Sequence, residues 1–312
     1  MRIAVFGTGG AGGYYGARLA QAGEDVTFIA RGEHLRSMQQ NGLRVDSPKG
    51  DFVLPSVSAT DDAGSVGKVD LIILGVKAWQ VTEAARAMGP LLGPDTVVLP
   101  LQNGVETPQQ LVAVLGRGHV FGGLAKIFSS LIGPGQIRHV GGPTSVTFGE
   151  MDNRRSQRAE NLVRVFNRAG VDADVPPDIH VAMWEKLLFI ASFGGLGAVT
   201  RAPIGVIRTV PETRRMLEEA MGEIYRVGRA RNIHFGSDIV ERTMAFTDSQ
   251  PADGTASMQR DIIASRPSEL ESWNGAVVRL GREVNVATPV HGFIYSSLLP
   301  LELRARGRLE FS

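Results

Sequence analysis

The chain has 312 residues and a formal net charge of +1 at pH 7, long enough for two domains with large buried cores. Because positive and negative charges balance, no overall field favours nucleic acid or an anionic membrane as a partner. The chain contains no cysteine, which excludes disulfides, cysteine-based zinc sites and a thiol nucleophile and agrees with the cytoplasm as the expected location.

A glycine-rich motif follows the first predicted strand. The apolar run Ile3–Phe6 leads directly into G-x-G-x-x-G spacing, and a helix is expected over residues 15–22, followed by a second strand from Asp25. In this context the motif predicts a dinucleotide-binding turn rather than a plain glycine turn, with the helix N-terminus directed at a pyrophosphate. The expected cofactor-binding residues of the turn are Gly7, Thr8, Gly9, Gly10, Ala11 and Gly12.

The end of the second predicted strand indicates which dinucleotide is bound. Residues 25–30 are followed by Arg31, and no carboxylate stands at the strand tip, where an NAD site usually places one for the ribose 2′-hydroxyl. A guanidinium suits a 2′-phosphate, so Arg31 favours NADP(H) over NAD. The alternative is a solvated arginine at a strand end, with Glu33 two residues further on.

Strands and helices alternate through the first half of the chain. Residues 45–57 predict a small hairpin, and Pro176-Pro177 ends the pattern. Buried strands are expected at 71–76 and 97–101, helices at 81–88, 107–115 and 154–169, and further strands at 119–121, 136–140, 145–148 and 171–175.

The second half is predicted to be almost entirely helical. The sequence therefore predicts an α/β, Rossmann-type, doubly wound NADP-binding domain over residues 1–176. An all-α substrate and catalytic domain over residues 177–312 follows it, with the active site expected in the cleft between them. The first residues resemble a folded strand rather than a signal peptide, and no run of 18 apolar residues suggests a membrane span.

Polar residues follow two of the expected parallel strands. Lys77 comes after the strand at 71–76, and Asn103 after the strand at 97–101. Ligands of open α/β sheets bind at the carboxyl ends of the strands, so both residues are candidates for cofactor contacts. Each could instead be an ordinary loop or cap residue.

Three polar sites stand out in the helical half. Lys186 lies inside a mostly apolar stretch, where it either extends to solvent or serves as a proton donor in a partly dry site. The segments around Ser257 and Glu269 are the other polar clusters, with helix caps and solvated faces as alternatives.

Six motifs in this order resemble the ketopantoate reductases, also called 2-dehydropantoate 2-reductases, and the resemblance covers the whole chain. They are the glycine motif with the arginine after the second strand, Val76-Lys77-Ala78-Trp79-Gln80, Gln102-Asn103-Gly104, Trp184-Glu185-Lys186-Leu187, Ser257-Met258-Gln259-Arg260-Asp261, and Glu269 five residues before Asn274-Gly275. The resemblance implies a Rossmann domain joined to an all-α domain. It also implies NADPH-dependent reduction of 2-dehydropantoate to pantoate, a step of pantothenate biosynthesis.

The resemblance also implies residue roles. Lys186 is similar to the family's catalytic lysine, which protonates the carbonyl oxygen as hydride arrives. Glu269 is similar to the carboxylate that orders the closed site and touches the cofactor. Asn103 would bridge cofactor and substrate, Ser257 would bind substrate, and Lys77 would contact the cofactor.

The chain departs from the family pattern near the lysine. The family usually places asparagines four and eight residues after it to bind substrate, whereas this chain has Ile190 and Gly194. The substrate is therefore less well indicated than the reaction class. If 2-dehydropantoate is a poor substrate, asparagine at both positions is expected to raise activity on it.

Two alternatives to the pantoate enzyme remain. One is an NADPH-dependent reductase of a different 2-oxo acid or ketone on the same scaffold. The other is a non-enzymatic NADPH-sensing protein, against which Lys186 and Glu269 argue because sensing needs neither. The scattered histidines predict no metal site, and the expected partner is a small 2-oxo acid, with a homodimer as a candidate assembly and no nucleic acid or membrane.

Overall fold

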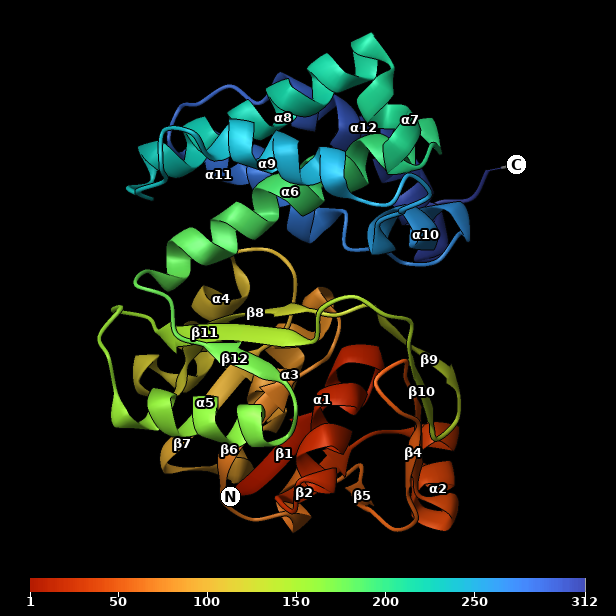
Figure 1. The fold of residues 1–312 in the computed structure, drawn as a ribbon, viewed down its shortest axis with the longest axis vertical. Helices are drawn as coiled ribbons and strands as arrows, with labels where there is room; N and C mark the ends of the chain where they lie inside the picture. Colours follow the sequence, from red (N-terminus) through yellow and green to blue (C-terminus); the bar gives the residue numbers. More distant parts are fainter. Residues whose placement is uncertain (312) are drawn as a thin grey trace. The chain divides into compact units, whose positions relative to one another are not determined.

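The structure, a computed structural model, describes residues 1–311 and divides into two compact units (Figure 1). The first unit contains residues 1–103 and 107–179, and the second contains residues 104–106 and 180–312. The expected boundary between the two functional domains, after residue 176, stays a prediction.

The first unit is built on a five-stranded parallel sheet with the order β5-β2-β1-β6-β7. This order, with the first strand in the middle, is that of a dinucleotide-binding sheet and confirms the α/β prediction. The strands are β1 (Arg2–Phe6), β2 (Asp25–Ile29), β5 (Ser58–Thr60), β6 (Val69–Leu74) and β7 (Leu92–Pro100).

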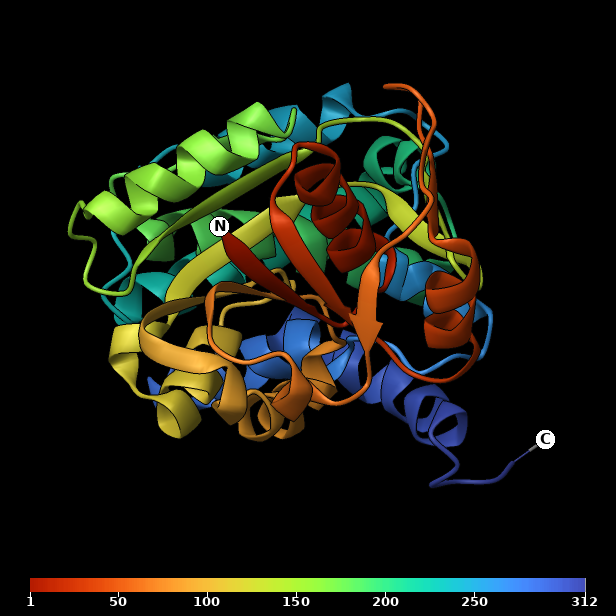
Figure 2. The ribbon, with the colours of Figure 1, turned by 90° about the horizontal axis from the view of Figure 1, so that it is seen from below.

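Both faces of this sheet are buried, as expected for parallel strands. Along β1, Ile3 and Val5 pack into a core formed with α1 (Gly10–Gln21) and α5 (Gln157–Arg168), whereas Ala4 and Phe6 pack into a core formed with α3 (Val81–Ala87) and α4 (Thr107–Leu115). Successive side chains of a strand point to opposite faces, so one apolar run supplies both cores. Figure 2 shows this unit from below.

Two smaller sheets complete the first unit, which also contains α2 (Gly32–Asn41). The predicted hairpin is β3 (Leu43–Asp46) paired with β4 (Phe52–Leu54), extended by β10 (Gln136–His139) and β9 (Ser129–Gly133). The other sheet has the order β12-β11-β8 and consists of β8 (Phe121–Lys126), β11 (Ser145–Glu150) and β12 (Asp172–Asp174).

Two expectations for this unit were wrong in detail, and two strands were missed. The first helix begins at Gly10, not at residue 15, because glycines that the sheet needs for close packing occupy its first turns. His119 belongs to a short 3₁₀ turn, and the strand begins at Phe121. The strands β5 and β9 were not predicted. β5 is short and gains its hydrogen bonds from β2, distant in sequence, whereas β9 pairs with the neighbouring β10.

The second unit is helical, and none of its described residues lies in a strand, which confirms the all-α prediction. Its helices are α6 (Ile179–Thr200), α7 (Ile204–Thr209), α8 (Pro211–Ala230), α9 (Ile239–Ser249), α10 (Ser257–Ile263), α11 (Ala276–Glu283) and α12 (Pro289–Ala305). A π-helical turn, Glu271–Gly275, leads directly into α11. Its hydrogen bond joins the Gly275 N–H to the carbonyl of Leu270, five residues earlier.

The helix α6 meets the length and composition of a membrane span, contrary to the expectation from the sequence. An 18-residue stretch of this helix has a mean hydropathy of 1.3, and 67% of that stretch is buried inside the protein. Such burial is typical of the core helix of a folded domain, and α6 serves as one here.

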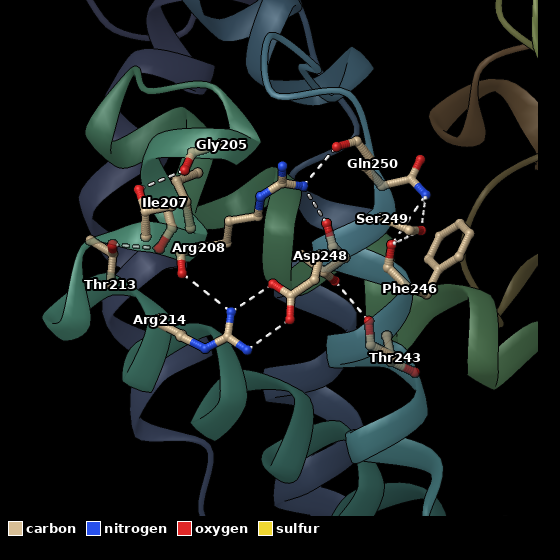
Figure 3. Close-up of polar contacts among 12 residues, drawn as sticks. Gly205, Ile207, Arg208, Thr213, Arg214, Thr243, Phe246, Asp248, Ser249 and Gln250 are labelled. Carbon is tan, nitrogen blue, oxygen red and sulfur yellow. Dashed lines mark hydrogen bonds and ion pairs between the residues drawn. The ribbon is translucent and has the colours of Figure 1, made fainter.

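Two arginines tie α7, α8 and α9 together (Figure 3). Arg214 donates to both carboxylate oxygens of Asp248, at 2.7 and 2.8 Å, and thereby lowers the pKa of that carboxyl group. Arg208 donates to the carbonyls of Thr247 and Gln250, where a cation also opposes the negative end of the α9 dipole. The junction of α7, α8 and α9 is therefore stabilised by charge-assisted hydrogen bonds as well as by apolar packing.

A fully buried polar chain connects four elements of the second unit. The Asn274 amide donates to the carbonyl of Ala191 on α6 and to Nδ1 of His291 on α12, and His291 Nε2 donates to the carbonyl of Ala220 on α8. Glu223 accepts the N–H groups of Val290 and His291 at the start of α12. This bonding requires a neutral imidazole, and burial lowers the pKa of His291 to about 4.

We expect His291 to make the protein sensitive to acid. The unfolded imidazole has its ordinary pKa of 6.5. Below pH 6.5 the unfolded imidazole takes up a proton that the buried His291 does not accept. The free energy of unfolding is therefore highest above pH 6.5 and decreases by about 3 kcal/mol as the pH falls toward 4. In His291→Gln this part of the pH dependence of the unfolding free energy should disappear, as measured by denaturant titration at several pH values. The exposed His234 provides the control, and identical slopes for wild type and His291→Gln would contradict the assignment.

Candidate functional site

Three glycines from separate segments meet where β1 ends. Gly7 has φ +98°, a conformation that side chains disfavour, and a Cβ there would lie 2.6 Å from the Val76 nitrogen. A Cβ on Gly75 would lie 2.5 Å from the Gly7 carbonyl oxygen, and one on Gly12 would also collide with that oxygen. The roles predicted for Gly7 in the turn and Gly12 in helix packing thus have steric support. Gly75 was missed, because no local pattern marks it.

Gly9 differs from these glycines because its missing side chain faces open space. The nearest protein atom to a Cβ there is the Gly75 oxygen, at 4.0 Å. Gly9 is the N-cap of α1, so the unpaired N–H groups of the first helical turn, from Gly10 to Gly12, lie directly after it. An open cradle at a helix N-terminus fits an anionic group such as a pyrophosphate.

His34 fastens the glycine-rich turn to the β9–β10 connection. Its Nε2 donates to the Thr8 carbonyl at 2.8 Å, and its Nδ1 accepts the Gly135 N–H at 2.9 Å. Both ring nitrogens are used by the neutral imidazole, and burial lowers the pKa of His34. The Thr8 hydroxyl adds a bond to the Ile29 carbonyl on β2. Sequence reasoning missed His34 because its partners belong to distant loops.

Arg31 lies at the end of β2, where it is the N-cap of α2. Its guanidinium is 3.7 Å from Glu83, and both side chains are 73% exposed. Such a surface ion pair contributes little stability. The guanidinium can therefore exchange this partner for a phosphate at small cost.

Lys77 and Asn103 follow neighbouring strands of the sheet, β6 and β7. The buried Gln102 connects these strand ends, since its Nε2 donates to the carbonyls of Leu74 and Val76 at 2.9 and 2.7 Å. Lys77 is exposed and lies 5.8 Å from the Trp79 ring centroid. The half-buried Asn103 makes no side-chain hydrogen bond to the described residues. Both residues thus follow the carboxyl ends of neighbouring parallel strands, where open α/β sheets bind ligands, and their contact with a cofactor stays a prediction.

Lys186, Ser257 and Glu269 all belong to the second unit. Lys186 is half-buried in the third turn of α6, Ser257 is the first residue of α10, and Glu269 is 8% exposed just before the π-helical turn. The candidate residues of the glycine turn, with Arg31, Lys77 and Asn103, belong to the first unit.

The backbone before Glu269 is clamped by α12. The buried Glu302 accepts both the N–H and the hydroxyl of Ser268, and Arg306 donates to the Ser268 carbonyl. Arg306 also pairs with Glu302 at 2.6 Å, so every polar group of Ser268 has a charged partner. This clamp fixes the position of the neighbouring Glu269, and the sequence contained no local signal for it.

The structure also describes the positions where the sequence departs from the family pattern. Ile190 is half-buried one helical turn after Lys186. A Cβ on Gly194 would lie 2.9 Å from Cζ3 of Trp273 and 3.1 Å from the Ala256 methyl group. An asparagine side chain at position 194 would therefore have to displace the Trp273 indole, and the expectation that asparagine at both positions raises activity stays a prediction. Among the described residues, no cluster of histidine and acidic side chains could hold a metal ion.

Comparison with known proteins gives matches over nearly the whole chain. Residues 3–153 match the model "Ketopantoate reductase PanE/ApbA", and residues 178–302 match the model of its C-terminal region. The 2-dehydropantoate 2-reductase of Mesorhizobium japonicum is 32% identical, with 93% of this chain and 94% of that protein covered.

Solved structures agree with this assignment. The 2-dehydropantoate 2-reductase of Geobacter metallireducens is 30% identical with a TM-score of 0.89, covering 98% of this chain and all (100%) of that one. A D-mandelate dehydrogenase in complex with NADH is 25% identical with a TM-score of 0.87, covering 98% of this chain and 100% of that one. The resemblance seen in six sequence motifs is confirmed: the chain belongs to the ketopantoate reductase PanE/ApbA family and is an oxidoreductase of that type.

Proposed function

We propose that the protein uses NADPH to reduce the ketone of a 2-oxo acid to a hydroxyl group, with 2-dehydropantoate, named for its relatives, as the first candidate substrate. The observation that carries the proposal is the open cradle at Gly9, before the first turn of α1. A nicotinamide cofactor agrees with the NADH complex of the related mandelate enzyme, and Arg31 favours the phosphorylated form for this chain.

Bound NADPH supplies the hydride, and the chain supplies binding and the proton. The first turn of α1 holds the pyrophosphate, and Arg31 holds the 2′-phosphate. Lys77 and Asn103 contact the cofactor, and Asn103 also contacts the substrate. Lys186 donates its Nζ proton to the carbonyl oxygen, because an ammonium both stabilises and neutralises the charge that develops there.

Glu269 and Ser257 complete the proposed site. Glu269 touches the cofactor and orders the closed site, with its backbone held by the Ser268–Glu302 clamp. Ser257 contributes a hydroxyl to the substrate. Location in the cytoplasm, participation in pantothenate biosynthesis and assembly as a homodimer are predictions that accompany this function.

A different 2-oxo acid is the second candidate substrate. The specific observation in its favour is the filled space at Gly194, together with the hydrocarbon side chain of Ile190. Measuring NADPH oxidation with 2-dehydropantoate beside other 2-oxo acids tests both candidates. No oxidation with any of them, together with intact NADPH binding, would favour the non-enzymatic NADPH-sensing alternative.

Gly9→Val should abolish NADPH binding without unfolding the protein. The valine side chain has room in the protein but occupies the space of the pyrophosphate. Fluorescence titration with NADPH and thermal unfolding measure the two effects. Gly89→Val is the matched control, since a Cβ there also meets open space away from the motif. A folded Gly9→Val protein with wild-type NADPH affinity would refute the pyrophosphate site.

Arg31→Ala should weaken NADPH binding by roughly 10- to 150-fold, the scale of a charge-assisted contact, and should hardly change NADH binding. Glu83→Ala is the informative control, because it removes the partner of Arg31 but keeps the guanidinium. NADPH affinity should be at least that of wild type in Glu83→Ala. Equal losses for NADPH and NADH in Arg31→Ala would show that Arg31 does not read the 2′-phosphate.

Lys186→Ala should lower kcat by roughly 10²- to 10⁴-fold and leave the Kd for NADPH nearly unchanged, since the proton is needed only as the alkoxide forms. Lys186→Arg should restore activity only in part, because a guanidinium holds its proton too tightly. The exposed Lys68, changed to alanine, is the control in the same steady-state assay. Near-normal kcat in Lys186→Ala would end this mechanism and direct attention to Lys77.

A further inference from the structure

The surface of α6 beyond Lys186 offers almost no polar chemistry. Between residues 187 and 199, Ser192 is the one side chain that carries a polar atom, and it is fully buried. The helix therefore presents an ammonium group followed by hydrocarbon.

Ile190 provides the first part of this hydrocarbon surface. It lies four residues after Lys186, and residues at this spacing are neighbours on one helix face. Its side chain is half-buried, so part of it remains accessible. A group held at the Lys186 ammonium on this face would thus meet a branched aliphatic side chain.

Trp273 provides the next part. The ring atoms nearest to the missing side chain of Gly194 are Cζ3 and Cε3, at 2.9 and 3.4 Å, and both belong to the benzene half of the indole. The indole N–H is on the other half of the ring system. The Ala256 methyl group packs beside these atoms, so the three atoms nearest to the missing side chain of Gly194 are all carbons.

Aromatic rings flank the same stretch of α6. Phe189 stacks on Phe193 with centroids 5.7 Å apart, and it meets Phe246 edge to face at 5.0 Å. Phe246 is 50% exposed. The surroundings of Ile190 on the helix are therefore apolar on the flank as well as along the axis.

A single hydroxyl balances this apolar character. Ser257, next to Ala256, is half-buried, and its hydroxyl makes no hydrogen bond among the residues that the structure describes. One ammonium and one free hydroxyl match a ketone oxygen and a carboxylate. Apart from the buried Ser192, residues 187–199 of α6 add no polar side chain that could pair with an additional hydroxyl group on a substrate.

We propose that the physiological substrate is a 2-oxo acid whose chain beyond the ketone is a branched or aromatic hydrocarbon without a hydroxyl group. This inference rests on the proposed ketone reduction and specifies its substrate class. The hydride of NADPH forms the new C–H bond at C2, the carbonyl π bond breaks, and its electron pair takes the Lys186 proton. The products are a 2-hydroxy acid and NADP⁺, and solvent restores the proton to Lys186.

A matched pair of substrates tests the proposal. 2-Dehydropantoate and 3,3-dimethyl-2-oxobutanoate have the same branched skeleton and differ by one hydroxyl group. We expect the kcat/KM of wild type for 3,3-dimethyl-2-oxobutanoate to exceed that for 2-dehydropantoate by roughly 10- to 100-fold, because a buried hydroxyl without a partner loses its hydrogen bonds to water. Calorimetric dissociation constants in the presence of NADP⁺ should follow the same order.

Variants of Ile190 locate the cause. Ile190→Asn should shift the kcat/KM ratio toward 2-dehydropantoate by roughly 10-fold or more, since an amide can pair with the hydroxyl. Ile190→Leu should keep the wild-type ratio.

The outcomes separate two failures. A wild-type ratio below roughly 10-fold, or an unchanged ratio in Ile190→Asn, overturns the substrate class and leaves ketone reduction standing. If the wild-type protein does not oxidise NADPH with any of the 2-oxo acids tested, both the proposed function and this inference fail.

Discussion

The contact of Gly7, Gly12 and Gly75 is the constraint on which the first unit depends. Here the turn after β1, the start of α1 and the end of β6 approach so closely that a single Cβ would collide with backbone. Backbone cannot move aside as a flexible side chain can, so the three segments must be glycine together. Their close approach brings the α1 N-terminus to the same edge as the ends of β6 and β7. At this edge the missing side chain of Gly9 leaves space for a ligand.

Polar anchors behind this edge and behind Glu269 share one property: each binds backbone rather than ligand. Gln102 joins the ends of β6 and β7, His34 joins two loops, and Glu302 holds the residue before Glu269. Buried side chains that bond to backbone confer a defined geometry on the segments they join. His34 and Glu302 belong to none of the six sequence motifs, since their partners include carbonyls and N–H groups that any residue provides.

The sequence predicted those features that depend on neighbours along the chain. The glycine motif, the parallel order implied by β1 and β2, and Lys186 within an apolar helix were all readable, because each is a local pattern. The pairing of β3 with β10 was not readable, since it joins segments far apart in the chain. The same reason hid Gly75, and it hid Trp273, which fills the space at Gly194 only after α6 and the π-helical turn have packed together.

The π-helical turn Glu271–Gly275 has a consequence for how this sequence can change by insertion and deletion. Its widened loop holds one more residue per turn than an α-helix, so Glu269 on one side and α11 on the other are in register only with that extra residue. Deleting one residue would tighten the turn and rotate everything before it by about 100° relative to α11. Trp273 and Asn274 would then face away from α6. Length in this segment is thus under stronger constraint than the identity of its exposed side chains, and natural variation is expected here as substitution rather than as gaps.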